Sequence, residues 1–188
     1  NLIELKNLKE KNSSIKALAY QLYENNGVLK RENVSEYLKN LEQNDRKILR
    51  DMGVKFGRYH IFLHKLIKPE PVIIRTLLWK NYHQKYFKLK PPTFGLNFIE
   101  DTDNRNKNFM LLCGFEKFDN YFVRIDILER LFMQIINSGS DENKEIKLVP
   151  EMLNLLGCSK ENFKKLIQKM NYKVTENKEN IFFRYQPK

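Results

Sequence analysis

Residues 147–185 read KLVPEMLNLLGCSKENFKKLIQKMNYKVTENKENIFFRY, and this stretch decides the fold of the C-terminal half. It begins with a short apolar segment, after which Pro150 suits the first turn of a helix. Gly157 interrupts the helical pattern, and Ser159 is a good N-cap for the next helix. Apolar residues then alternate around the polar turn 176–180, which predicts a β-hairpin.

A strongly amphipathic helix is predicted just before this stretch, over 125–137, because its apolar residues recur with helical spacing. The resulting order is helix, short strand, helix, turn, helix and β-hairpin, which is typical of a winged helix. The same order occurs over 14–63, with a shorter hairpin whose tip is Gly57-Arg58. We therefore expect an α+β chain, mainly α with small β-hairpins, that contains tandem winged-helix-like units.

The predicted organisation has three parts: a helical, winged-helix-like unit over 1–68, a basic linker helix and loop over 69–114, and a winged-helix-like domain over 115–188. Prolines at the start of the linker separate it from the first unit. The linker helix is expected to bury three apolar residues: Ile74, Leu77 and Leu78. Another of its faces carries one cation and three aromatic residues: Arg75, Trp79, Tyr82 and Tyr86.

The charge of the chain is strongly positive and unevenly distributed. The 188 residues include 41% hydrophobic and 30% charged residues, which is an ordinary globular composition, and the net charge is +11. Segment 54–94 holds nine basic residues and one acidic residue, so most of the excess lies there. A concentrated basic stretch attracts polyanions, because each neutralised phosphate releases a condensed counterion. Nucleic acid is therefore the expected partner, and an acidic protein or a merely lysine-rich surface are the alternatives.

Two groups of side chains are the candidate nucleic-acid contacts. Cations that follow a backbone, combined with aromatic rings that stack on bases, are what single-strand binding requires. The group around the linker helix contains Lys55, Arg58, Lys65, Lys68, Arg75, Lys80, Tyr82 and Tyr86. The group on the outer face of the helix over 160–170 contains Lys160, Lys164, Lys165 and Lys169. Lysines contact phosphates without reading bases, so we expect little sequence preference. The alternative for the helix over 160–170 is a solvated lysine face on a protein-interaction module.

No catalytic apparatus is recognisable in the sequence. It contains no phosphate-binding glycine motif of the P-loop or dinucleotide type, and no HExxH. Two distant cysteines, Cys113 and Cys158, give neither a metal site nor a disulfide framework, which fits a reducing cytoplasm. No apolar run approaches the roughly 20 residues of a membrane span. We therefore expect a cytoplasmic monomer without catalytic residues, metal or cofactor.

Three stretches of the sequence look familiar as a set. The first is Gly53-Val54-Lys55-Phe56-Gly57-Arg58-Tyr59-His60-Ile61-Phe62-Leu63, followed by Leu66-Ile67-Lys68-Pro69 and Arg75-Thr76-Leu77-Leu78-Trp79. The second is Val123-Arg124-Ile125-Asp126-Ile127-Leu128-Glu129-Arg130-Leu131. The third is Pro150-Glu151-Met152-Leu153-Asn154-Leu155-Leu156-Gly157-Cys158-Ser159, with Phe163 and Tyr172 beyond it. Together, over about residues 45–185, they resemble the C-terminal region of alphaproteobacterial superfamily-two helicases, relatives of the mitochondrial degradosome RNA helicase.

This resemblance implies that the chain is part of a longer protein. ATP-driven unwinding would reside in motor domains upstream of Asn1, which would also bind ATP and Mg, and no catalytic residue is carried over to this chain. The Gly57-Arg58 turn and Lys68 would belong to the helicase scaffold or to its nucleic-acid path. One departure is His64, where the family tends to have a proline.

The sequence leaves three main functional hypotheses and a fourth, an unrecognised enzyme, which would need a pocket with converging polar groups. The first is an accessory region that holds single-stranded RNA or DNA next to the helicase motor domains of the same chain. The second is a winged-helix regulator that binds duplex DNA, which would require dimerisation and sequence preference. The third is a protein-docking platform of an RNA-processing assembly, whose basic surface meets an acidic partner. The sequence does not choose between RNA and DNA.

Overall fold

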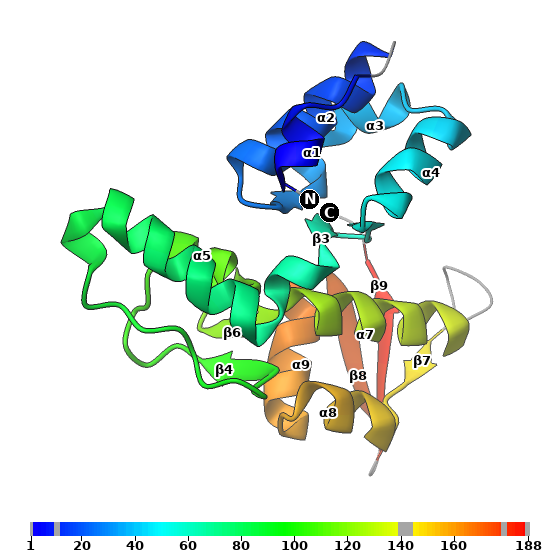
Figure 1. Ribbon diagram of the computed structural model, residues 1–188. Coiled ribbons are helices and arrows are strands. Elements are labelled where there is room, and N and C mark those ends of the chain that lie inside the picture. The colour runs from blue at the N-terminus through cyan, green and yellow to red at the C-terminus, as the bar shows by residue number, and fades with distance from the viewer. Residues whose placement is uncertain (1, 10–11, 139–144, 178–179, 187–188) are drawn as a thin grey trace. The chain divides into compact units, whose positions relative to one another are not determined.

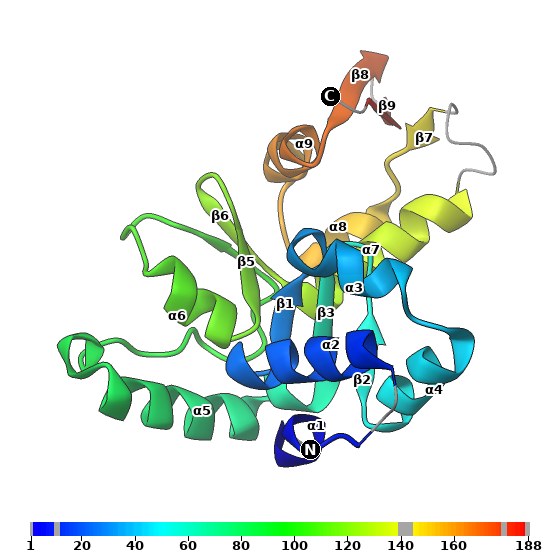
Figure 2. The same ribbon diagram turned by 90° about the horizontal axis from the view of Figure 1, so that it is seen from above.

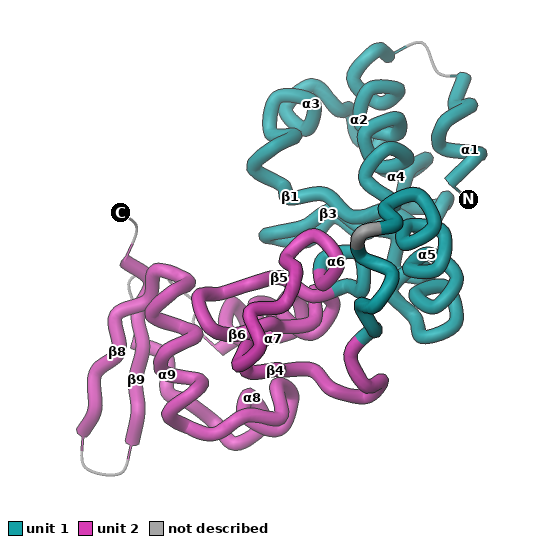
Figure 3. Tube along the Cα trace, turned by 90° about the vertical axis from the view of Figure 1, so that its left-hand side faces the viewer, with its two compact units in different colours: residues 1–91, 111–114 teal, residues 92–110, 115–188 magenta. Residues whose placement is uncertain are grey.

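The computed structural model describes the whole chain except residues 1, 10–11, 139–144, 178–179 and 187–188. The chain divides into two compact units. The first unit comprises residues 1–91 and 111–114, and the second comprises residues 92–110 and 115–188 (Figure 3). Helices and short antiparallel strands alternate in both units, so the expectation of an α+β fold is confirmed (Figure 1).

The first unit is built from short helices and one small sheet. Its elements are α1 (Leu2–Lys6), α2 (Ser13–Glu24), β1 (Val28–Lys30), the 3-10 turn η1 (Arg31–Val34), α3 (Ser35–Lys39), α4 (Gln43–Asp51), β2 (Val54–Phe56), β3 (His60–Leu63), η2 (His64–Ile67), α5 (Pro69–Tyr82) and η3 (Gln84–Tyr86). The sheet is antiparallel in the order β1-β3-β2, so the strand that comes last in the sequence lies in the centre. All four residues of β3 are buried as a result.

Helix α2 supplies much of the core of this unit. The side chain of Asn12 accepts a hydrogen bond from the backbone amide of Ser14 and so caps the helix, as Asn does well. The apolar residues of α2 recur at helical spacing and are fully buried: Ile15, Leu18, Ala19 and Leu22. They pack in one cluster with Leu29, Ile61 and Leu63 of the sheet, across which α2 lies (Figure 2).

The second unit contains two sheets. Its elements are β4 (Phe98–Glu100), α6 (Lys107–Leu112), β5 (Phe115–Phe118), β6 (Tyr121–Arg124), α7 (Ile125–Ser138), β7 (Ile146–Lys147), α8 (Pro150–Leu156), α9 (Lys160–Lys169), β8 (Tyr172–Asn177) and β9 (Asn180–Tyr185). The end of α6 is assigned to the first unit. The predicted Pro150 start and Ser159 cap are both present, and the Ser159 hydroxyl accepts from the Asn162 amide at 3.2 Å.

The three sheets share one connection pattern. Their orders are β1-β3-β2, β4-β6-β5 and β7-β9-β8, so in each sheet the third strand lies between the first and the second. The first and third sheets also share the order of elements along the chain. A helix comes first, then the first strand, then two helices, and then the hairpin formed by the other two strands. The middle sheet, over 98–124, was not expected from the sequence. Within the stretch predicted as a linker, α5 belongs to the first unit and β4 to the second.

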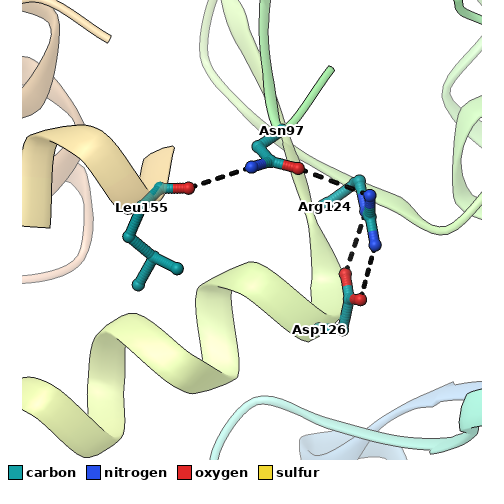
Figure 4. A network of polar contacts seen from close by, with 4 residues as sticks. All are labelled: Asn97, Arg124, Asp126 and Leu155. Atoms are coloured by element: carbon teal, nitrogen blue, oxygen red, sulfur yellow. Dashed lines mark hydrogen bonds and ion pairs between the residues drawn. The ribbon is translucent and has the colours of Figure 1, made fainter. Parts of the chain in front are cut away.

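A polar network fastens four segments of the second unit together (Figure 4). The guanidinium of Arg124, at the end of β6, donates two hydrogen bonds to the carboxylate of Asp126 in the first turn of α7, at 3.0 and 2.6 Å. It also donates to the amide oxygen of Asn97 at 3.4 Å, and the Asn97 amide nitrogen donates to the Leu155 carbonyl at 3.0 Å. The network therefore fixes the end of α8 against the sheet that precedes α7.

Asp101, which follows β4, has partners that the sequence did not reveal. Its carboxylate accepts hydrogen bonds from the Arg105 backbone amide at 2.8 Å and from the Lys117 ammonium at 2.7 Å. Burial raises the pKa of Asp101, but these two hydrogen bonds and the positive charges outweigh burial and lower its pKa below the ordinary value. Asp101 is therefore held in the folded unit by a backbone amide and a lysine.

The second unit should lose stability in acid through Asp101. A carboxyl whose pKa is lowered in the folded state stabilises that state above its unfolded pKa of about 4, and this contribution is lost as the pH falls through the folded pKa. Asp101→Asn should therefore lower the free energy of unfolding at pH 7 by about 1–3 kcal/mol. The difference from the wild type should shrink as the pH is lowered below about 4. Urea denaturation at several pH values measures this, with the exposed Asp103→Asn as control. A pH-independent difference would contradict the assignment.

Candidate nucleic-acid interface

Helix α5 buries its arginine. The guanidinium of Arg75 is 7% exposed; its Nη1 donates a hydrogen bond to the Leu66 carbonyl at 2.8 Å, and its Nη2 donates to the Asn26 carbonyl. Burial lowers the pKa of Arg75 to about 10, so the group remains a cation at neutral pH. The prediction that Arg75 contacts nucleic acid is corrected here, because this guanidinium is enclosed in the core and binds two backbone carbonyls.

The apolar face of α5 lies on the protein surface. The buried side of the helix consists of Val72, Arg75 and Thr76. The exposed side is apolar, with exposed fractions between 44% and 64%: Ile73, Ile74, Leu77 and Leu78. The expectation that Ile74, Leu77 and Leu78 enter the core was therefore wrong. An exposed apolar patch of this kind marks an interaction surface more often than an inert one.

The C-terminal end of α5 carries an aromatic cluster, which we define as Trp79, Tyr82, His83 and Tyr86. After α5 ends, the His83 amide donates to the Trp79 carbonyl at 2.8 Å, and η3 brings Tyr86 back over the helix. The rings of Trp79 and Tyr86 stack, with centroids 5.1 Å apart and planes 18° apart. His83 lies 4.6 Å from Trp79, and Tyr82 meets His83 edge-on at 4.9 Å. Tyr82 is 85% exposed, so the cluster presents one open ring.

Three lysines lie near this cluster in the sequence: Lys80, Lys88 and Lys90. Lys80 is half-buried; its ammonium donates to the Leu89 carbonyl at 3.2 Å and lies 5.8 Å from the ring centroid of Phe87. Lys88 and Lys90 follow closely in the chain and are exposed, as is Phe87. Lys80 and Tyr82 lie at the C-terminal end of α5 and Tyr86 lies in η3, so these three residues are the candidate contacts of one site. Phe87 joins them through its contact with Lys80, whereas Lys88 and Lys90 are close to the site in the sequence.

The remaining candidates of the first unit are exposed but lie elsewhere. Lys55 is on β2, and Arg58 is in the turn between β2 and β3. Lys65 is in η2, and Lys68 immediately precedes α5. Because α5 has 14 residues, Lys68 is separated from the aromatic cluster by about 20 Å of helix. These four cations therefore form no single site with Tyr82, although they belong to the same unit.

Helix α9 of the second unit carries the other predicted lysines. Lys160 and Lys165 are exposed. Lys164 forms ion pairs with Glu161 at 2.6 Å and Glu176 at 2.8 Å, and the hydrogen bonds to these two carboxylates raise the pKa of Lys164. Lys169 lies 3.1 Å from a carboxylate oxygen of Asp119. Two of the four lysines are therefore partly neutralised within the protein.

The described residues offer little else for catalysis or ligand binding. No group of three or more His, Cys, Asp or Glu side chains among them is arranged to hold a metal ion. Burial raises the pKa of Cys113 to about 12 and that of Cys158 to about 11, so both thiols stay protonated at neutral pH. None of the helices seen in the described ranges has the length and apolar content that crossing a membrane requires.

Comparison with known proteins returned no relatives. No known family matches the sequence, no curated protein is significantly similar to it, and no solved structure significantly matches its fold.

Proposed function

We propose that this chain is a nucleic-acid-binding accessory region of an ATP-dependent helicase, which holds single-stranded RNA or DNA next to motor domains outside the chain. The observation that carries the proposal is the exposed ring of Tyr82 at the edge of the aromatic cluster. Lys80, Lys88 and Lys90 lie close to it in the chain. The resemblance of the three sequence stretches to helicase C-terminal regions supports the helicase part of the proposal.

Physical chemistry favours a single strand as the ligand of this cluster. A base in a single strand has a free face that can stack on an aromatic ring, whereas the faces of bases in a duplex are already covered. The Tyr82 ring contacts His83, which lies beside the stacked pair of Trp79 and Tyr86. Lysines near the ring attract the phosphates, and this attraction weakens as salt is added.

The finer fold assignment is part of the same proposal. Both α2–β3 and α7–β9 follow the element order of a winged helix, and both sheets place the last strand between the first two. These features support two winged-helix units. In such units the second helix of the helix-turn-helix pair contacts DNA, which here is α9 in the second unit. The ion pairs of Lys164 and Lys169 reduce the positive charge of that helix, which favours weak contacts without sequence preference over a sequence-specific duplex regulator.

Tyr82→Ala should weaken the binding of single-stranded oligonucleotides about fivefold or more, because one stacked base contributes about 1–3 kcal/mol. Tyr20→Ala is the matched control, since Tyr20 is also an exposed tyrosine of the first unit but lies on α2, away from the cluster in the chain. Fluorescence anisotropy with labelled oligonucleotides measures both affinities. Equal affinities for the two variants would contradict stacking on Tyr82.

A second candidate function is favoured by a specific observation. The four exposed apolar residues of α5, Ile73, Ile74, Leu77 and Leu78, suit a protein partner better than a phosphate backbone. A protein-docking platform with an acidic partner would use this face together with Lys65 and Lys68. It requires no affinity for nucleic acid, so unchanged binding after Tyr82→Ala would favour it over the first candidate.

A further inference from the structure

The third sheet, β7-β9-β8, has an outer face that is separate from the candidate site on α5. The strand register and the burial of its residues define the two faces of this sheet. Ile146 of β7 pairs with Phe183 of β9, which pairs with Val174 of β8, and this row faces the core because Ile146 and Phe183 are buried. Since side chains alternate along a strand, the next residues point outward. The outward residues are Lys147, Lys173, Thr175, Phe182 and Arg184.

Phe182 occupies the centre of this outer face. It lies on the central strand, where it is paired with Lys147 on one side and with Thr175 on the other. Arg184 is two residues further along the same strand and points the same way. The ring of Phe182 is partly exposed, and the cations Lys147 and Arg184 are exposed. An aromatic ring thus stands on an open sheet surface with cations next to it.

Two of the cations face each other directly. Lys173 of β8 pairs with Arg184 of β9, and like charges at directly opposite positions of a sheet destabilise it. The side chains of these two residues and of Lys147 form no hydrogen bond or ion pair with another described residue, in contrast to those of Lys164 and Lys169 of α9. An anion placed between Lys173 and Arg184 would remove this repulsion. The carboxylate of Glu145 lies on this face as well, because it accepts a hydrogen bond at 3.3 Å from the hydroxyl of Thr175, one of the outward residues.

The inward face of the third sheet is tightly packed. Phe183 is fully buried, and its ring packs edge-on against Phe163 of α9 and Tyr172 of β8, each with a centroid distance of 5.7 Å. Such packing fixes β8 and β9 relative to α9. The outer residues of the sheet therefore keep their spacing, which a stacking and phosphate-binding surface requires.

We propose that this outer face, made of Lys147, Lys173, Phe182 and Arg184, is a second binding surface for single-stranded RNA or DNA. A base stacks on Phe182, and the three cations contact the phosphates on either side of it. Its ligand class rests on the proposed function, but its residues lie in the other unit and do not include the aromatic cluster. Stacking on Phe182 requires a free base face, which a duplex does not offer.

Two variants test the surface separately for charge and stacking. Lys173→Gln/Arg184→Gln removes both facing cations, and Phe182→Leu keeps an apolar side chain but removes the ring. Lys9→Gln/Lys16→Gln is the matched control, because it removes the same charge from exposed positions of the first unit. The probe is a labelled 15-nucleotide oligouridine, compared with a labelled DNA duplex over a range of salt concentrations. Circular dichroism checks that each variant is folded.

The expected results differ for each variant. The double cation variant should reduce the slope of log affinity against log salt for oligouridine by about 1.4, because each single-strand phosphate contact contributes about 0.7. Phe182→Leu should weaken oligouridine binding about fivefold or more and leave duplex binding unchanged. The control should change neither quantity by a comparable amount.

Other outcomes separate the two proposals. If both sheet variants bind oligouridine like the control while Tyr82→Ala binds weakly, this surface is overturned and the proposed function stands. If the sheet variants weaken binding and Tyr82→Ala does not, the surface stands and the site on α5 falls. If they weaken duplex binding as much as oligouridine binding, the assignment to single strands is overturned. If the wild-type chain binds none of the probes, both proposals fall.

Discussion

Arg75→Ala should lower the free energy of unfolding of the first unit by about 3–5 kcal/mol, because it removes the hydrogen-bond donor of the Leu66 and Asn26 carbonyls and leaves a cavity in place of a buried side chain. Hydrogen bonds made by a charged group contribute about 1.5–3 kcal/mol each. Arg75→Lys should lie between the wild type and the alanine variant, since one ammonium cannot reproduce the fork of a guanidinium.

Trp79 fluorescence measures this effect, because the chain has a single tryptophan and it is one turn from Arg75 on α5. Urea denaturation of Lys68→Ala is the control, since it removes the same charge from an exposed position of the same unit. Lys68→Ala should change the stability by no more than about 0.5 kcal/mol. If Arg75→Ala unfolds at the wild-type urea concentration and instead lowers nucleic-acid affinity, Arg75 is a surface contact and the buried geometry is wrong.

Gly27→Ala should be the second strongly destabilising substitution, at about 2–5 kcal/mol. Gly27 adopts φ +80° in the turn between α2 and β1, a conformation that costs other residues about 1–2 kcal/mol. Its amide donates to the Leu22 carbonyl at 2.7 Å, and its carbonyl accepts from the Leu63 amide at 2.8 Å. A Cβ at this position would lie 2.6 Å from Leu66 Cδ1 and 3.2 Å from Leu63 Cδ1, so overpacking adds about 1–3 kcal/mol.

Gly157→Ala separates these two costs. Gly157 has a similar φ of +70° after α8, but a Cβ there meets no atom within 4 Å. It should therefore show the conformational cost alone, about 1–2 kcal/mol. Thermal or urea unfolding followed by circular dichroism compares the two variants. Equal destabilisation by both substitutions would mean that the turn at Gly27 is not packed against Leu63 and Leu66.

Local sequence patterns predicted much of the fold. Helical spacing of apolar residues identified α2, α7 and α9, and the Pro150 and Ser159 signals located the starts of α8 and α9. These features depend on residues that are close in the chain. The sheet over 98–124 could not be predicted in the same way. Its strands have only three or four residues, and two of them, β4 and β5, lie in a stretch without clear hydrophobic periodicity.

Helix α5 shows why hydropathy alone assigned the wrong face. Helical spacing correctly placed Arg75 and Trp79 on one face of the helix. Leu77 and Leu78 were predicted in the core, since apolar residues are usually buried, but they are exposed. Carbonyls 9 and 49 residues away in the chain accept hydrogen bonds from the two Nη atoms of the buried arginine, and no local pattern reveals such partners. The same limit applies to Lys169, whose carboxylate partner Asp119 is distant in sequence.

The candidate site was predictable in part. The spacing of Tyr82 and Tyr86 along the helix placed them near Lys80, and the structure brings the three together at the end of α5. The outer face of the third sheet was missed. The alternation of Phe182 and Arg184 in the last strand was a usable signal, but the pairing of Lys173 with Arg184 depends on the strand register.

The most direct test of the proposed function is the affinity of this chain for labelled single-stranded RNA, single-stranded DNA and duplex DNA, measured by fluorescence anisotropy at two salt concentrations. Tighter binding to single strands than to the duplex, weakened by salt, is the result that the proposal predicts. Absence of binding to all three near physiological salt, or tighter binding to the duplex, would contradict it.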